Sequence, residues 1–186
     1  MNRLIIYVIF LIFSFQFASA KEDSKINLIF SPLQLGYRYA KQMDTQMVWQ
    51  NANSFAVGGQ YQRHIFLLDY GQFSDSSGNQ MLSYRKDRTE WLLSYRYAVY
   101  SLAAHLNLGM GFGLGVYEDM VKSRLGTQEV SESSGAQVLA SGLVSLGGNW
   151  NYFFYAAELQ MLQGKDYDPQ PTLGGLLRIG IQFAIF

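Results

Sequence analysis

The alternation of residues 101–117 restricts the fold of this chain more than any other feature. Every even-numbered position in the segment is apolar, whereas the odd-numbered positions are mostly small or polar. The apolar set is Leu102, Ala104, Leu106, Leu108, Met110, Phe112, Leu114 and Val116. Successive side chains of a β-strand point to opposite faces, whereas a helix would mix the two sets. The segment is therefore predicted to be a long strand with one fully apolar face.

Eight segments of the chain are predicted to be strands, and the alternation is weaker in residues 64–73, 136–146 and 151–162. The predicted strands are residues 33–40, 55–63, 64–73, 89–99, 101–117, 136–146, 151–162 and 173–186. Long polar segments alternate with short joints, and the long ones are residues 41–53, 74–88, 118–135 and 163–171. An even number of antiparallel strands with long connections on one side and short turns on the other is typical of a membrane barrel. The predicted fold is all-β, an eight-stranded antiparallel up-and-down transmembrane β-barrel.

The composition favours a lipid-facing barrel over a soluble β-sandwich. Aromatic residues make up 16% of the chain and charged residues only 15%, whereas charged residues average about 25% in soluble proteins. A barrel in lipid needs apolar side chains outside, aromatic rings at the interfaces, and charges in the lumen and loops. The formal net charge of +0 gives no indication of a nucleic-acid partner, and the absence of cysteine excludes disulfides and thiol chemistry.

The N-terminus has the three-part pattern of a secretory signal peptide. Arg3 precedes an almost unbroken apolar run over residues 4–17, and Ala18-Ser19-Ala20 then supplies a small-residue cleavage site. The run is shorter than the roughly 20 apolar residues that a membrane-spanning helix needs. We therefore expect residues 1–20 to be a cleaved signal peptide and residues 21–186 to form a single barrel domain.

With its strand pattern, its strand count and its terminal Phe186, the chain resembles the small eight-stranded outer-membrane barrels of the OmpA/OmpX type. The resemblance implies a bacterial outer-membrane location, contact with outer-membrane lipid, and insertion by the barrel assembly machinery. It also implies that Phe186 is part of the assembly signal in the last strand. Bare barrels of this class are structural, adhesive or protective, so the resemblance implies a monomeric, non-enzymatic protein.

The side of the strands that would face the lumen collects charged residues and one histidine. This set is Arg38, Asp69, Glu90, Arg96, His105, Glu158 and Arg178. A basic residue facing lipid near the midplane would cost about 2–4 kcal/mol, whereas charges inside a barrel can satisfy one another. We expect a hydrogen-bonded network that plugs the lumen, with Glu158 and Arg178 as its best pair; separately hydrated residues in a wet lumen are the alternative.

A stripe of glycines lies on the inward side of the longest predicted strand. Its members are Gly109, Gly111, Gly113 and Gly115. The space beside them could form a ligand cavity or a narrow channel, or it could accommodate large side chains from across the barrel. Because small barrels mix small and large interior residues to fit their taper, we expect filling. Glu90 is predicted to face this stripe, and Arg96 and His105 to lie equally far from a turn near Tyr100.

No pattern in the sequence predicts a catalytic residue, a cofactor site or a metal site. His64 and His105 are the two histidines, and His105-Leu106-Asn107 does not match the His-x-Ser arrangement of outer-membrane lipid A deacylases. The predicted function is a structural or surface-interacting, non-enzymatic outer-membrane barrel. The alternatives are a narrow pore and a lipid-binding or lipid-modifying barrel. The loop predicted at residues 118–135 is the candidate contact for a surface partner.

Overall fold

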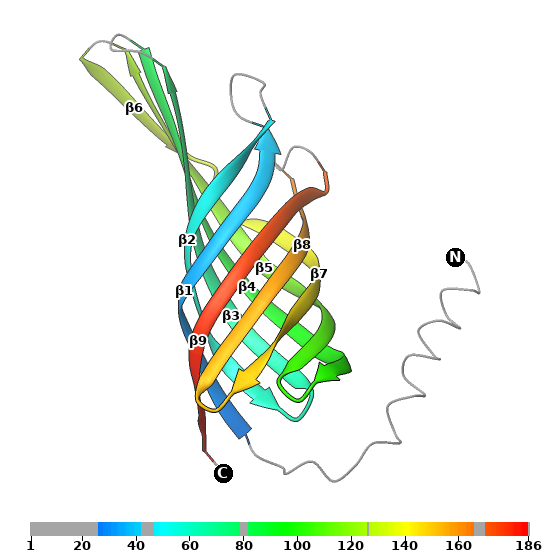
Figure 1. Cartoon of the computed structure of the whole chain (residues 1–186). Coiled ribbons are helices and arrows are strands. Elements are labelled where there is room, and N and C mark those ends of the chain that lie inside the picture. The colour runs from blue at the N-terminus through cyan, green and yellow to red at the C-terminus, as the bar shows by residue number, and fades with distance from the viewer. Residues whose placement is uncertain (1–25, 42–46, 79–81, 126, 166–169, 186) are drawn as a thin grey trace.

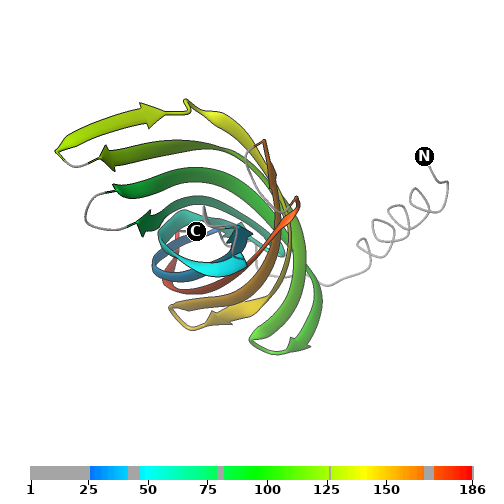
Figure 2. The ribbon, with the colours of Figure 1, turned by 90° about the horizontal axis from the view of Figure 1, so that it is seen from above.

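Nine strands, all paired antiparallel, make up the computed structural model, which describes residues 26–41, 47–78, 82–125, 127–165 and 170–185. The strands are β1 (Ile26–Lys41), β2 (Met47–Tyr61), β3 (His64–Gly78), β4 (Leu82–Ala103), β5 (Leu106–Leu125), β6 (Gln128–Ser133), β7 (Gln137–Trp150), β8 (Phe153–Gly164) and β9 (Thr172–Ala184). Each strand pairs with its neighbour in sequence, except that β6 and β7 both pair with β5. Pairing of β1 with β9 closes the sheet into a barrel (Figures 1 and 2).

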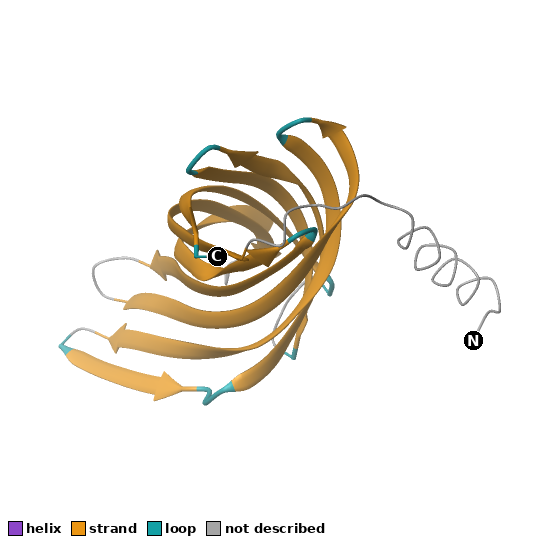
Figure 3. Cartoon of the chain, turned by 90° about the horizontal axis from the view of Figure 1, so that it is seen from below, coloured by secondary structure: helices purple, strands orange, loops and turns teal. Residues whose placement is uncertain are grey.

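The barrel has eight strands because β6 and β7 occupy the same edge of β5. Strand β7 pairs with residues 107–117 of β5, and β6 pairs with residues 120–125 farther along. The interruption falls between Ser133 and Gln137, where Gly135 has a φ of 69° that favours glycine. The predicted eight-stranded antiparallel barrel is therefore confirmed, with its seventh strand broken into two pieces. Viewed from below, the strands curl around a single lumen (Figure 3).

The outer wall of the barrel is apolar. Strand β8 alternates between exposed and buried positions along most of its length, as a strand with two different faces does. Its outward Leu159 is 73% exposed, and outward Ile179 on β9 is 61% exposed. Large apolar side chains exposed on every barrel strand far exceed the patches that soluble monomers carry, and they match the lipid-facing band of a membrane barrel. Among the described residues, no helix is long and apolar enough to cross a membrane.

This apolar belt ends at a definable row on β4 and β5. Trp91 and Val116 are directly opposite each other and both point outward. The next outward pair, Thr89 and Glu118, is polar. Trp91 also belongs to an aromatic group on the outer wall, with its ring centroid 4.8 Å from that of Tyr70. We take this row as the upper limit of the membrane-facing wall on these strands.

Four strands continue beyond the belt as an outer extension. It consists of residues 74–78 of β3, residues 82–88 of β4, residues 118–125 of β5, and β6, and it rises past the ends of β8 and β9 (Figure 1). The segments 74–88 and 118–135 were expected to be loops, and that expectation is wrong for most of their length. Both faces of the extension carry polar residues, so the apolar alternation that identifies a half-buried strand is lost.

Two of the short turns also differ from expectation. The β4–β5 turn is at Ala104–His105, with Ala103 opposite Leu106, rather than near Tyr100. The β7–β8 turn is at Asn151–Tyr152 rather than at residues 147–149. The alternation runs on through the first turn because Leu102 and Ala104 are apolar, so periodicity alone could not locate it. The β2–β3 joint is at Gln62–Arg63, within one residue of its expected place.

Candidate functional site

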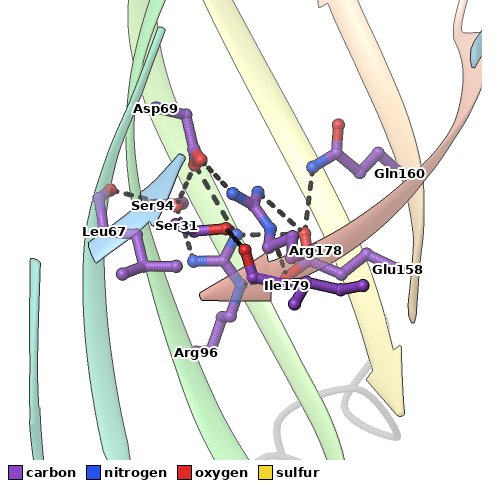
Figure 4. Close-up of polar contacts among 9 residues, drawn as sticks. All are labelled: Ser31, Leu67, Asp69, Ser94, Arg96, Glu158, Gln160, Arg178 and Ile179. Carbon is purple, nitrogen blue, oxygen red and sulfur yellow. Dashed lines mark hydrogen bonds and ion pairs between the residues drawn. The ribbon is translucent and has the colours of Figure 1, made fainter. Parts of the chain in front are cut away.

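Four charged side chains from four strands meet inside the barrel. They are Asp69 on β3, Arg96 on β4, Glu158 on β8 and Arg178 on β9 (Figure 4). Each lies on the inward side of its strand, and their exposed fractions are between 1% and 8%. Because these strands approach the lumen from different sides, the side chains must reach across it to find partners. We call this group the lumen ring.

Glu158 is held by both arginines of the lumen ring. Arg96 binds it with two parallel hydrogen bonds, Nε to Oε1 at 2.7 Å and Nη2 to Oε2 at 3.0 Å. Arg178 donates from Nη2 to Oε2 at 3.1 Å and places Nε 3.0 Å from Oε1. Bidentate arginine–carboxylate pairs are among the strongest and most directional polar contacts in proteins. Glu158 is therefore the central member of the ring.

Asp69 completes the ring on the opposite side of the lumen. It accepts a hydrogen bond from Nη1 of Arg178, and its Oδ2 lies 3.6 Å from Nη2 of Arg96. The Ser94 hydroxyl donates to Oδ2 of Asp69 at 2.8 Å and accepts from Nη1 of Arg96 at 2.8 Å. Two positive and two negative charges thus alternate around the ring. Their pairing offsets the cost of removing each charge from water, which is on the order of several kcal/mol for a lone buried ion.

The ring brings together four of the residues expected in the lumen network, and the expected Glu158–Arg178 contact is one of its pairs. Across β8 and β9, Arg178 is opposite Ala156 and Glu158 is opposite Leu176, so the pair expected to be best is diagonal. The tighter bidentate contact to Glu158 comes from Arg96, on the far side of the lumen. The alternation of residues along a strand identifies which side chains point inward, but it does not determine the distances between side chains on opposite sides of the lumen.

The other expected members of the network lie elsewhere. His105 is exposed in the β4–β5 turn, which corrects its assignment to the lumen. Glu90 is buried, but it is opposite Gly71 and Tyr117 rather than the glycine stripe. Arg38 lies on β1 opposite Gln50, and its side chain is outside the described part of the structure, as is Phe186.

The glycine stripe lets β5 approach β4 closely. A Cβ on Gly111 would collide with the carbonyl oxygen of Tyr95, and one on Gly115 with that of Trp91. A Cβ on Gly113 would lie 2.6 Å from Oγ of Ser141. The space beside Gly111 and Gly115 is therefore occupied by the backbone of β4, and Gly113 lies against Ser141 of β7, rather than against large side chains from across the barrel. Gly109 borders the lower of two cavities described below.

Two small cavities flank the lumen ring, each of about 40 Å³. The upper cavity touches Asp69, Arg178 and the buried Gln34, whose amide group has no hydrogen-bond partner among the described residues. The lower cavity touches Arg96 and Asn149. Each has room for a few waters, because one water needs roughly 10–15 Å³ of this kind of space. The lumen is therefore divided by the ring into an upper and a lower compartment.

A second ion-pair cluster lies just above the belt and was not anticipated from the sequence. Arg88 binds Asp119 with Nε to Oδ1 at 2.6 Å and Nη2 to Oδ2 at 2.7 Å, and Lys86 Nζ lies 2.8 Å from Oδ2. Burial raises the pKa of Asp119, but hydrogen bonds and charges from Arg88 and Lys86 outweigh it and hold the pKa below its ordinary value. The sequence did contain a signal for this cluster. Arg88 has the same inward parity as Arg96 on β4, and Asp119 has the same inward parity as Gly115 on β5. Assigning both residues to loops concealed it.

The lumen ring is a neutral cluster of two acids and two bases. Its charges neutralise one another through direct ion pairs, and Ser94 accepts one further hydrogen bond from Arg96. In the described ranges, no group of three or more histidine, cysteine, aspartate or glutamate residues could hold a metal ion. His64 lies on the outer wall, where its Nδ1 is 2.8 Å from the hydroxyl of Tyr95.

Comparison with solved structures identifies the fold. No protein-family model matches the sequence, and no curated protein matches it. The neisserial surface protein A (NspA) matches with a TM-score of 0.56 and 10% identity, over 85% of this chain and 95% of that one. The N-terminal β-barrel domain of Pseudomonas aeruginosa OprF matches with a TM-score of 0.53 and 14% identity, over 86% and 98%. Ail of Yersinia pestis, solved with the heparin analogue sucrose octasulfate, matches with a TM-score of 0.52 and 11% identity, over 86% and 97%. The chain thus has the fold of the small eight-stranded outer-membrane β-barrels.

Proposed function

We propose that this chain is a non-enzymatic bacterial outer-membrane protein whose sealed barrel anchors the outer extension at the cell surface. The observation that supports the proposal is the combination of ion pairs that cross the lumen with four strands that continue beyond the apolar belt. A closed lumen gives the barrel the role of an anchor, and the extension gives it a surface that can meet other molecules. Residues 1–20 act as the export signal in this proposal, and the barrel assembly machinery inserts the rest.

The fold neighbours support a surface role without fixing a ligand. One is described as a surface protein and another as an attachment protein crystallised with a polysulfated saccharide analogue. Those descriptions belong to those proteins, and the low identities carry only the fold to this chain. What this chain contributes is an extension with polar residues on both faces, which is chemically suited to contacts outside the membrane. The proposed partner surface is the strand hairpin at 118–135, in place of the loop that was expected there.

Selective labelling tests the orientation and the location together. The chain has no cysteine, so a single introduced thiol gives an unambiguous signal. We expect Ser131→Cys, on exposed β6, to react with a membrane-impermeant maleimide on intact cells. We expect Ala104→Cys, in the exposed turn at the other end, to react only after the outer membrane is permeabilised. Equal labelling of both positions on intact cells, or recovery of the protein in the soluble fraction, would overturn the proposal.

A narrow pore is the second candidate, and the two cavities that flank the ring favour it. Opening would require the arginines and carboxylates to separate, which would join the cavities into one path. The proposed seal predicts that the purified wild-type protein gives no single-channel steps in planar bilayers, like detergent alone. The double variant Arg96→Ser/Glu158→Ser removes one charge of each sign and shortens both side chains, so we expect it to conduct. Reproducible steps from the wild type would support the pore instead.

A further inference from the structure

Two cations face each other across strands on the outer extension. Arg85 of β4 is directly opposite Lys122 of β5. Cβ atoms at directly opposite positions are only about 5 Å apart, and like charges there destabilise a sheet. A β-ladder in water can avoid this arrangement at little cost, because surface positions accept many residues. Its presence calls for a compensating negative charge.

The compensation within the described residues is incomplete. Arg85 is bonded through Nε alone, to Oδ1 of Asp87 at 2.9 Å, and its side chain is 58% exposed. Lys122 makes no hydrogen bond or ion pair with any described residue. Burial raises the pKa of Asp87, but hydrogen bonds from Ser74 and Arg85 and the charges of Arg85 and Lys122 hold that pKa below its ordinary value. Asp87 is therefore ionised and already engaged, and the terminal nitrogens of both cations remain available.

Both cations lie on the side of the sheet that continues the membrane-facing wall. Arg85 has the outward parity of Trp91, and Lys122 has that of Val116. Each is six positions beyond the last apolar row, about 20 Å along the strand at roughly 3.3 Å per residue. With the strand tilt of about 40° usual in membrane barrels, this places them roughly 15 Å above the apolar belt. That level, on the lipid side of the protein, belongs to the saccharide headgroups of the outer leaflet rather than to open solvent.

The other charged residues on the outward face of the extension either have a partner of opposite charge or lie closer to the apolar belt. Arg124 lies two positions beyond Lys122 on the same side, but it is opposite Glu129 on β6, so the two charges balance. Glu118 lies lower, beside the belt, where its Oε1 accepts a hydrogen bond from Ser133. The excess positive charge of this face is therefore concentrated at Arg85 and Lys122, whose charges both act on the single carboxylate of Asp87.

We propose that Arg85 and Lys122 together bind a phosphate group of the phosphorylated glycolipid, lipopolysaccharide, that surrounds the barrel in the outer leaflet. The two free Nη groups of Arg85 suit a bidentate phosphate contact, and Lys122 adds a mobile point charge from the neighbouring strand. The phosphate removes the repulsion between the two cations. The inference rests on the proposed outer-membrane location and names the partner of the extension's outer face.

Titration of lipopolysaccharide into the detergent-solubilised, folded protein tests the site, with binding followed by microscale thermophoresis. The test variant is Arg85→Gln/Lys122→Gln, and the matched control is Lys165→Gln, which removes an exposed cation from the β8–β9 connection. We expect the double variant to bind about tenfold more weakly, because each exposed charge pair contributes up to about 1 kcal/mol. The control should bind like the wild type. The difference should shrink at high salt and vanish with dephosphorylated lipopolysaccharide.

The outcomes separate this inference from the proposed function. All variants are first checked for heat-dependent gel migration and for surface labelling of Ser131→Cys, so loss of location would be seen independently. Equal binding by the double variant and the wild type overturns the site, as does equal binding of phosphorylated and dephosphorylated lipopolysaccharide. If the double variant loses binding only to a soluble heparin oligosaccharide, the face recognises a soluble polyanion and the glycolipid assignment fails.

Discussion

Replacing Glu158 by glutamine is expected to lower the free energy of unfolding by about 3–5 kcal/mol. The amide keeps the shape of the side chain, but it removes the one negative charge that both Arg96 and Arg178 contact. Two buried guanidinium groups would then share Asp69 alone, which is 8% exposed. Breaking one partner out of a buried ion network is costly because the remaining charges cannot regain their hydration. Urea unfolding in lipid vesicles, followed by tryptophan fluorescence, measures the change.

The matched control for this variant is Glu132→Gln. Glu132 is exposed on β6, so the same chemical change should alter stability by no more than about 0.5 kcal/mol. A double-mutant cycle with Arg96→Met then tests the closest pair of the ring. If the effects of Arg96→Met and Glu158→Gln add within about 0.5 kcal/mol, the two residues do not interact and the lumen ring is not a network.

Replacing Gly111 by alanine is expected to prevent the barrel from closing normally between β4 and β5. The added methyl group would meet the backbone carbonyl of Tyr95 and lie 3.0 Å from Cα of Arg96. A flexible side chain could move aside, but these are backbone atoms of a paired strand. We expect a loss of more than about 3 kcal/mol, at the upper end of the cost of overpacking a core. The measurement is the fraction of protein that migrates as folded barrel on an unboiled gel, together with urea unfolding.

Gly142→Ala is the control for the glycine substitution. Gly142 lies on β7 opposite Phe112, and no atom lies within 4 Å of the position its Cβ would take. The same change there should leave folding unaffected, because the methyl group points into free space. Normal folding of Gly111→Ala would show that β5 can move away from β4, and the close approach would then have no structural role.

Parity in the sequence was sufficient to place the four residues of the lumen ring on the inner side, but it did not predict the closest contact among them. Asp69, Arg96 and Glu158 could be assigned to the inner side because they alternate with apolar residues that face lipid. Which carboxylate meets which arginine depends on the curvature and stagger of the closed sheet, and neither is written in a local pattern. Glu158 is bound most closely from across the lumen, by a strand that is distant in sequence.

Periodicity failed wherever the environment did not differ between the two faces of a strand. His105 was placed in the lumen because the apolar residues around it continue the alternation through an exposed turn. The outer extension was assigned to loops because polar residues occupy both of its faces. The contact between Arg88 and Asp119 was missed for the same reason, although both residues keep the parity of the strands below. The strands of a membrane barrel can therefore be predicted from their alternation where one face meets lipid, but not where they continue above the membrane.

The origin of the ring's charges bears on how the protein can enter a membrane. The β3–β4 hairpin carries Asp69 and Arg96, and the β8–β9 hairpin carries Glu158 and Arg178, so each hairpin brings one charge of each sign. A hairpin that arrives alone can therefore neutralise itself, which lowers the cost of exposing it to lipid before its neighbours are in place. Closure then adds contacts across the lumen, because Arg96 also binds Glu158 and Arg178 also binds Asp69. The same four residues thus form one pair within each hairpin and, in the closed barrel, further ion pairs that join the two hairpins across the lumen.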